Sequence, residues 1–261
     1  MNASKPRLVR YATPAGPCWG VLAEKLYELH GDLYARWKTG PEVGEVGSVT
    51  LLPPVAPSKI VGVGRNYAAH AAEHEVEVPA EPLLFLKPPS AVIGPDQPIL
   101  LPQQSGRVEH EAELALVIGR RCRNVSPESA WAYVLGVSCA NDVTARDLQR
   151  RDGQWARAKG FDTFCPVGPW LIPGVSEAEV ANLVVTCRVN GEVRQAGRTS
   201  EMVFAPTELI AYAAAAMTLN PGDLLLTGTP AGVGQLQAGD VVEVEIEGIG
   251  LLRNPVQAAP R

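Results

Sequence analysis

The stretch that decides the fold is His110-Glu111-Ala112-Glu113-Leu114-Ala115-Leu116-Val117-Ile118. Residues two apart in a strand share a face, so Glu109, Glu111 and Glu113 are expected to point the same way. From Leu114 onward the run is apolar at every position, which predicts a strand buried on both sides. Carboxylates at the mouth of such a strand would be crowded and partly desolvated, and a bound cation would relieve their repulsion. Oxygen donors without cysteine or clustered histidine favour Mg²⁺, Mn²⁺ or Ca²⁺ over zinc.

A second acidic run shows that alternation alone is weak evidence for a metal site. Glu243, Glu245 and Glu247 alternate in the same way, with Val242, Val244 and Ile246 between them. That pattern is typical of an amphipathic strand with one solvated acidic face, and we predict no ligand there.

Composition restricts the class of protein. The chain has 261 residues, 46% of them hydrophobic and 20% charged, with a net charge of −5. It contains no Lys/Arg-rich run and no apolar stretch near the ~18 residues of a membrane span, so neither nucleic acid nor membrane is an expected partner. The opening Met-Asn-Ala-Ser-Lys-Pro lacks a secretory signal, and the five scattered cysteines contain no C-x-x-C. We expect a cytoplasmic protein with reduced thiols.

The first ~55 residues are expected to form a small β domain (1–55), followed by a main domain (56–261). Short strand-like runs recur in the first part, with Gly31-Asp32 as a hairpin turn, and Pro53, Pro54 and Pro57 mark a linker. The four predicted N-terminal strands are Arg7–Tyr11, Trp19–Leu22, Lys25–Leu29 and Leu33–Trp37.

The main domain is predicted to be α+β, mostly β, with a few short helices. Helices are expected from Asn66, as cap, to about His74, from Ser126 to about Leu135, and over Thr207–Met217. Strands are expected at Lys59–Val63, Leu83–Leu86, Glu111–Ile118, up to Ala140, Asp223–Leu226 and Val241–Ile246.

Several other residues are candidates for chemistry, each with a plainer alternative. His70 and Glu73 are three apart on a predicted helix and could form a general base with its orienting carboxylate, or be solvated. Asp142 or Thr144 could simply cap a helix. Arg146 could bind a substrate carboxylate, and Lys159 could steady an enolate, or both could be surface residues. The turn Leu226-Thr227-Gly228-Thr229-Pro230 could hold an anion or be structural.

Taken in order, these segments resemble one known family. They are Gly64-Arg65-Asn66-Tyr67-Ala68-Ala69-His70-Ala71-Ala72-Glu73, Phe85-Leu86-Lys87-Pro88, His110-Glu111-Ala112-Glu113-Leu114, Asn141-Asp142-Val143-Thr144-Ala145-Arg146-Asp147, Ala158-Lys159-Gly160-Phe161 and Leu226-Thr227-Gly228-Thr229-Pro230-Ala231-Gly232-Val233-Gly234. Together they are similar to the fumarylacetoacetate hydrolase (FAH) family over about residues 58 to 255. The first ~50 residues resemble the small N-terminal domain of many bacterial members.

The resemblance implies a β-roll core, a mixed β-sheet with short helices, in a homodimer. It also implies Mg²⁺ (or Mn²⁺) held by Glu111, Glu113 and Asp142. The family's catalytic His–Glu dyad falls on His70 and Glu73, with Lys159 adding positive charge. Its substrate-binding positions fall on Arg146, Gln149 and Thr229.

The function implied is metal-dependent chemistry on a small 2-oxo acid, with a dicarboxylic substrate. Likeness to bacterial members favours 2-hydroxyhepta-2,4-diene-1,7-dioate isomerase, which acts in aromatic catabolism. Acylpyruvate or fumarylpyruvate hydrolase and oxaloacetate decarboxylase remain alternatives, since one enolate serves all three reactions. A non-catalytic β module stabilised by a cation is the alternative of another class.

Overall fold

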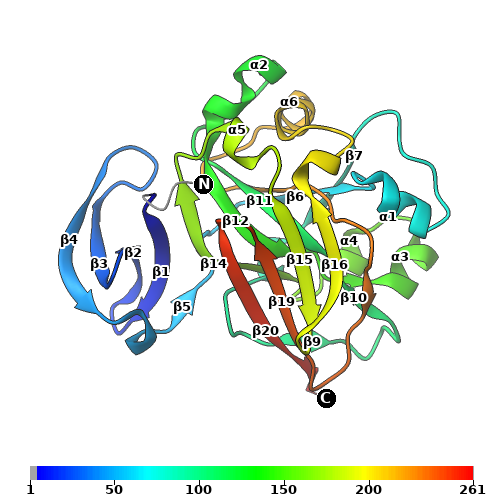
Figure 1. Cartoon of the computed structure of the whole chain (residues 1–261), viewed down its shortest axis with the longest axis horizontal. Helices are drawn as coiled ribbons and strands as arrows, with labels where there is room; N and C mark the ends of the chain where they lie inside the picture. The colour runs from blue at the N-terminus through cyan, green and yellow to red at the C-terminus, as the bar shows by residue number, and fades with distance from the viewer. Residues whose placement is uncertain (1–4, 261) are drawn as a thin grey trace.

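The computed structural model describes residues 5–260, which fold into three β-sheets with short helices around them (Figure 1). The expected α+β class, mostly β, is confirmed. Met1 to Ser4, where the absence of a signal was inferred, lie outside the described residues.

The largest sheet has twelve strands and mixes parallel with antiparallel pairs. Its order is β4-β3-β2-β1-β14-β12-β11-β17-β6-β7, with β5 beside β1 and β8 beside β14. The strands are β1 (Arg7–Thr13), β2 (Gly16–Leu22), β3 (Leu26–Gly31), β4 (Trp37–Gly44), β5 (Leu51–Leu52), β6 (Ile60–Gly64), β7 (Leu83–Lys87), β8 (Val92–Ile93), β11 (Ala112–Ile118), β12 (Val134–Asn141), β14 (Cys165–Pro173) and β17 (Leu224–Leu226).

Two smaller sheets accompany it. One has the order β16-β15-β19-β20-β9, and the other β13-β10-β18. Their strands are β9 (Ile99–Leu101), β10 (Val108–His110), β13 (Thr144–Ala145), β15 (Val184–Val189), β16 (Glu192–Arg198), β18 (Gly234–Gln235), β19 (Val241–Ile246) and β20 (Gly250–Ala258).

The helices are short and lie at the margins of the sheets (Figure 1). The α-helices are α1 (Ala68–Glu73), α2 (Pro127–Ala130), α3 (Arg146–Asp152), α4 (Ala156–Lys159), α5 (Glu177–Val180) and α6 (Pro206–Ala216). Single 3₁₀ turns occur at Val46–Ser48, Pro89–Ala91, Trp131–Tyr133 and Thr199–Glu201. None of the helices in residues 5–260 is long and apolar enough to cross a membrane.

Strand β11 is buried on both faces, as its sequence predicts. Leu114, Leu116 and Ile118 enter a core shared with the five-stranded sheet, which packs on this face. Ala115 and Val117 enter a second core on the opposite face. Both cores lie directly behind the acidic residues, so the mouth of β11 has rigid walls.

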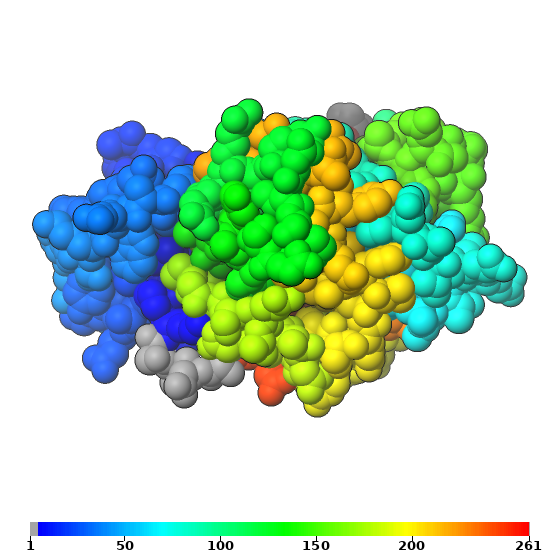
Figure 2. Space-filling view, turned by 90° about the horizontal axis from the view of Figure 1, so that it is seen from above, coloured from blue at the N-terminus to red at the C-terminus, as the bar shows by residue number. Residues whose placement is uncertain are grey.

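The N-terminal strands extend the large sheet through one ladder. Leu8 of β1 pairs with Leu171 of β14, and its side chain joins the second core. Val9 and Leu26 instead belong to a small core of the N-terminal strands. These strands stand at one end of the molecule, and the segment carrying α1 stands at the other (Figures 1 and 2).

Two of the predicted elements differ clearly from the observed secondary structure. The strand expected at Leu33–Trp37 is wrong, because Asp32 Oδ1 accepts the Tyr34 N–H at 2.8 Å and turns the chain before β4 begins. The helix expected to reach Leu135 ends at Ala130, and after one 3₁₀ turn Val134 already pairs with Ile118 in the large sheet.

The predicted helix caps are also wrong. Tyr67, not Asn66, precedes α1, and the Asn66 amide is instead bonded to Thr227 O at 2.8 Å and Phe204 O at 3.1 Å. Neither Asp142 nor Thr144 caps α3, whose preceding residue is Ala145. These polar side chains serve tertiary contacts instead of local ones.

Candidate active site

The three predicted metal ligands converge because β11 and β12 are antiparallel neighbours. Ala112 pairs with Asn141, and the Asp142 N–H donates to Glu111 O at 2.8 Å. Glu111 falls between β10 and β11, so its own N–H is free of the ladder and donates to Asn141 Oδ1 at 2.9 Å. Carboxylate oxygens of Glu111, Glu113 and Asp142 lie within 4.8 Å of one another, and all three residues are buried.

Glu111 and Asp142 are surrounded by cations of the protein. Lys159 Nζ lies 2.9 Å from Glu111 Oε2 and 2.5 Å from Asp142 Oδ2. Lys87 Nζ lies 2.5 Å from Asp142 Oδ1. Although burial opposes it, Lys159 and Arg146 hold the pKa of Glu111 below its ordinary value. Glu111 is therefore ionised, and both carboxylates are paired with protein cations.

Glu113 has no such partner among the described residues. The contact made to its carboxylate is the Gly228 N–H, at 2.6 Å from Oε2. Burial, with Asp142 and Glu111 close by, raises the pKa of Glu113 well above its ordinary value. The Gly228 amide in the predicted anion-holding turn thus binds a carboxylate of the protein itself.

Arg146 is buried beside the acidic group rather than on the surface. Its Nε donates to Glu109 Oε2 at 2.6 Å, and another guanidinium nitrogen lies 2.5 Å from Glu111 Oε1. A third contact reaches Gln149 Oε1 at 2.6 Å, one turn along α3. Glu109 therefore forms an ion pair with Arg146. The three glutamates expected to be equivalent on one face are not, because only Glu111 and Glu113 belong to the acidic triad.

His70 and Glu73 do form a pair on α1. His70 Nδ1 lies 3.3 Å from Glu73 Oε2, and His70 is buried. Burial lowers the pKa of His70, so its ring is neutral at pH 7. The Gly232 N–H donates to Glu73 Oε1 at 3.1 Å, which ties the carboxylate to the loop after β17.

Thr229 lies at the end of this site, but its hydroxyl is already engaged. It donates to Ala112 O at 2.8 Å and accepts from Gln195 Nε2 at 2.7 Å. Gln195 also accepts the Ala112 N–H at 3.0 Å. The contact predicted between Thr229 and a substrate stays a prediction.

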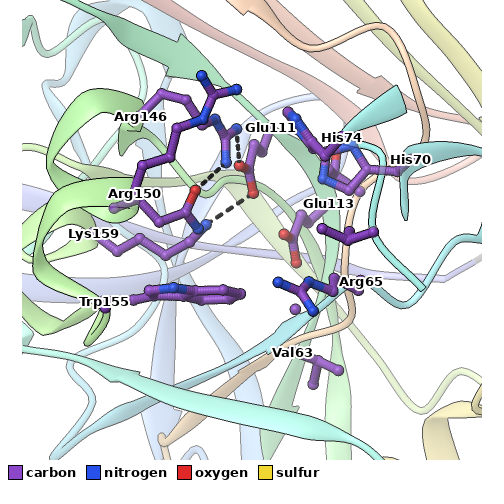
Figure 3. Close-up of a pocket in the computed structure, with 15 residues that line it drawn as sticks. Val63, Arg65, His70, His74, Glu111, Glu113, Arg146, Arg150, Trp155 and Lys159 are labelled. Atoms are coloured by element: carbon purple, nitrogen blue, oxygen red, sulfur yellow. Dashed lines mark hydrogen bonds and ion pairs between the residues drawn. The ribbon is translucent and has the colours of Figure 1, made fainter. Parts of the chain in front are cut away.

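A cavity of about 310 Å³ brings the predicted residues together (Figure 3). Asp142 and Glu73 lie behind its wall, each held against a residue that lines it. The predicted residues in its lining are His70, Glu111, Glu113, Arg146, Gln149, Lys159 and Thr229.

Other lining residues escaped the sequence reasoning. Arg65, His74, Arg150 and Trp155 also face the cavity. Lys87 belongs to one of the family motifs, and a lysine at the end of an apolar strand is itself a signal of a buried charge. Gln195 lies in a polar strand without any such signal.

The donor set fits a hard divalent cation. All three residues offer carboxylate oxygens, which Mg²⁺ and Mn²⁺ prefer. Glu113 adds an observation specific to this structure, because burial and two nearby carboxylates raise its pKa and a bound cation would oppose that shift. A buried triad that could bind a divalent ion is thus present.

The fold and the site define a β-rich protein with a buried carboxylate triad beside a cationic cavity. Comparison with known families matches residues 59–257 to the fumarylacetoacetate (FAA) hydrolase C-terminal model and residues 7–54 to the Rv2993c-like N-terminal model. The chain belongs to the fumarylacetoacetate hydrolase family, and the predicted resemblance is confirmed.

Solved structures and relatives agree with this assignment. The 2-hydroxyhepta-2,4-diene-1,7-dioate isomerase from Mycobacterium marinum is 43% identical with a TM-score of 0.89, covering 98% of this chain and 100% of that one. The 5-carboxymethyl-2-hydroxymuconate delta-isomerase from Mycobacterium smegmatis is also 43% identical with a TM-score of 0.89, covering 97% and 100%. The mitochondrial oxaloacetate tautomerase fahd2 of Xenopus laevis is 46% identical over 80% of this chain and 69% of its own.

Proposed function

We propose that this enzyme moves a proton within small 2-oxo or 2-hydroxy-2-enoic dicarboxylic acids, with 2-hydroxyhepta-2,4-diene-1,7-dioate as the first candidate substrate. One observation carries the proposal: the His70 ring and two carboxylates of the acidic triad, Glu111 and Glu113, face one small cavity. A proton acceptor and a site that favours enolate charge are therefore available to the same bound molecule.

His70 is suited to act as the base. With Nδ1 held by Glu73, the neutral ring carries its proton on that nitrogen, which leaves the Nε2 lone pair for a carbon acid. Glu73 is in turn held by the Gly232 N–H, so the ring orientation is fixed. The protonated ring can then return the proton to another carbon of the same substrate.

The metal ligands in this proposal are Glu111, Glu113 and Asp142, with Mg²⁺ or Mn²⁺ as the ion. When bound, such an ion supplies positive charge next to the carboxylate and 2-oxo oxygens of the substrate. Lys159 already reaches two of the three ligands and keeps a positive charge at the same place. Arg146 and Gln149 orient the substrate from α3, and Thr229 closes the site.

A dicarboxylic substrate is favoured by a second cation on the cavity wall. The Arg65 guanidinium lies 6.0 Å from the Trp155 ring centroid and forms no ion pair with a described residue. In Figure 3 it lies between Trp155 and Glu113. Because Arg146 and Lys159 are already paired with carboxylates, Arg65 remains available for the distal carboxylate of a substrate.

The names of the relatives support proton transfer over bond cleavage. An isomerase and a tautomerase both relocate a proton through an enol, whereas a hydrolase and a decarboxylase also break a carbon–carbon bond. C–C hydrolysis and decarboxylation stay as alternatives, and the non-catalytic module would leave the His70–Glu73 pair without a use.

The test is a substrate panel with Mg²⁺, with Mn²⁺ and with chelator. Hydroxyheptadienedioate, fumarylpyruvate, acetylpyruvate and oxaloacetate would be followed by ultraviolet absorbance and by proton NMR in deuterium oxide. We expect metal-dependent isomerisation or deuterium uptake without cleavage products. Pyruvate with fumarate or acetate would establish a hydrolase, CO₂ a decarboxylase, and no turnover of the panel would reject the enzyme proposal for these substrates.

Variants sharpen the same test. His70→Asn should abolish deuterium uptake while metal binding persists. Arg65→Gln should raise KM for the dicarboxylic acids and leave KM for acetylpyruvate unchanged. An equal effect on both substrate classes would remove Arg65 from recognition of a distal carboxylate.

A further inference from the structure

Helix α1 carries a second group of metal-binding side chains. His70, Glu73 and His74 are three and four residues apart, so they share one face of the helix and its C-terminal turn. One ligand atom from each lies within 4.8 Å of the other two. The His70 and His74 rings stand perpendicular, with their centroids 4.7 Å apart.

His74 is the residue that the proposed reaction leaves unexplained. Its Nε2 is buried and has no hydrogen-bond partner among the described residues. A buried nitrogen without a partner is costly, and most such atoms in folded proteins are satisfied. His74 nevertheless lines the same cavity as His70, so a ligand arriving through the cavity can reach it.

The donor set differs from that of the acidic triad. Two imidazole nitrogens and one carboxylate suit Zn²⁺ and similar transition metals, whereas three carboxylates suit Mg²⁺. Zinc ligands lie about 2.0–2.2 Å from the ion, so neighbouring donors are roughly 3.3 Å apart. The His70 Nδ1 to Glu73 Oε2 distance is already 3.3 Å. Rotation of the His74 ring would bring its donor nitrogen to a similar distance from these two atoms.

The charges nearby permit a cation at this position. Arg146 lines the same cavity, and its guanidinium is held by Glu109 and Glu111. Glu73 Oε2 faces His70, and the Glu73 carboxylate is anchored by the Gly232 amide. The open side of the cavity supplies the fourth coordination position.

We propose that His70, Glu73 and His74 form a second, inhibitory metal site that selects Zn²⁺ over Mg²⁺. An ion held there occupies the His70 nitrogen and carboxylate that form the dyad, so proton transfer stops while Mg²⁺ stays in the acidic triad. Binding of the ion is independent of the proposed function, and only the inhibition rests on it.

The first experiment measures Zn²⁺ binding to the whole chain by calorimetry in saturating Mg²⁺. We expect one Zn²⁺ per chain, an affinity lowered by at least about tenfold in His74→Ala, and no change in His30→Ala, an exposed histidine elsewhere. His74→Gln serves as a second variant if His74→Ala folds poorly. Co²⁺ as a probe should give an intense visible absorption in the wild type that both His74 variants lose.

The second experiment measures activity. Zn²⁺ should inhibit the Mg²⁺-loaded wild type, and the Mg²⁺-dependent activity of His74→Ala, whatever its rate without Zn²⁺, should resist Zn²⁺. Unchanged Zn²⁺ affinity in both His74 variants, or Zn²⁺ binding that is abolished by Glu113→Gln alone, overturns the site. Zn²⁺ binding that depends on His74 in a chain inactive toward the whole panel keeps the site and rejects the proposed function.

Discussion

Among single residues, Glu113 differs from its neighbours because no cation in residues 5–260 forms an ion pair with its carboxylate. Lys87, Lys159 and Arg146 hold the other two ligands of the triad. Without an ion, the negative charge of Glu113 opposes folding, since its pKa is raised and its ionised form is disfavoured. Such a cost to stability is expected of a residue whose proposed role is to bind a cation.

Replacing Glu113 by Gln tests this directly. The amide keeps the size of the side chain and can still accept the Gly228 N–H, but it removes the charge. We expect calorimetry to show loss of Mg²⁺ binding, together with a higher melting temperature of the metal-free protein at pH 7. Glu245→Gln is the matched control, because the Glu245 side chain is 45% exposed and already paired with Arg188. Retained Mg²⁺ affinity would remove Glu113 from the ligands.

His70 predicts the acid limb of the pH profile. Burial lowers the pKa of His70 below its ordinary value of 6.5, and the base must be neutral to act. With saturating Mg²⁺, kcat/KM should therefore be constant near pH 7 and fall as pH drops through a value below 6.5. A limb centred above pH 7, or an identical limb in the residual activity of His70→Asn, would contradict this role.

The sequence alone predicted most of these site residues, but it did not predict which side chains they pair with. From sequence alone, a surface position was the favoured interpretation of both Arg146 and Lys159, and only the fold shows both buried against Glu111. Lys87 is 55 residues from Asp142 along the chain, so no local pattern connects them. Contacts of this kind depend on strand register, which local sequence does not state.

At the scale of elements, the loop after β17 controls the orientation of the dyad. Gly232 has φ +100°, and a Cβ there would lie 2.1 Å from the Arg194 carbonyl oxygen. Only glycine allows both the left-handed conformation and this close approach. The Gly232 N–H that results is the group that anchors Glu73.

The variant Gly232→Ala should therefore lower kcat more than it lowers Mg²⁺ affinity. Gly239→Ala provides a control with the same strain, since Gly239 has φ +99° and nothing within 4 Å of its added Cβ. Backbone strain should lower the free energy of unfolding of each variant by about 1 kcal/mol, and the clash with the Arg194 carbonyl should lower that of Gly232→Ala further. Equal kcat in the two variants would show that Glu73 does not need this anchor.

The bounds of helices and strands could be predicted where the hydrophobic periodicity extends over many residues. The predictions were wrong where pairing in the sheet overrides a local preference. The helix expected at Thr207–Met217 is observed at Pro206–Ala216. Strand β19 buries Val242, Val244 and Ile246 and leaves its glutamates at the surface, as predicted. The helix from Ser126 was overestimated because pairing of Val134 in the sheet overrode its local helical preference.

For the whole molecule, Asp223 joins the start of the main domain to the large sheet. Its carboxylate accepts the N–H groups of Ser58, Lys59 and Asn220 and pairs with the Lys59 ammonium. Although burial opposes it, these contacts hold the pKa of Asp223 below its ordinary value of 3.8. The stabilisation is therefore present above about pH 4 and is lost as pH falls through the lower, folded-state pKa.

We expect Asp223→Asn to reduce the free energy of unfolding at pH 7 by about 2 to 3 kcal/mol. The gap between wild type and variant should narrow below pH 4, where the wild-type carboxylate becomes protonated. Denaturant titrations of wild type and variant at pH 7 and pH 3 measure the difference in the free energy of unfolding at each pH. Asp96→Asn, at a side chain that is 75% exposed, should change neither value by more than ~0.5 kcal/mol.

The sequence predicted the α+β fold class, but it did not predict how the N-terminal strands are joined to the large sheet. The Pro-rich stretch suggested two domains, and the structure adds that β1 continues the large sheet through Leu8 and Leu171. That pairing joins residues 163 positions apart, and nothing local to either strand specifies it. Composition and motif order reveal the family, whereas sheet continuity depends on the folded whole.

The placement of the N-terminal strands at the end away from α1 has a practical consequence for attaching the enzyme to a solid support. Lys87 and Lys159 are buried, and Lys5 and Lys59 are partly buried in ion pairs. Lys25 and Lys38 are more accessible and lie beside or within the strands of the N-terminal part. Amine-reactive coupling should therefore tether the protein by the end remote from its cavity. An immobilised catalyst prepared in this way presents its working end to the flowing solution.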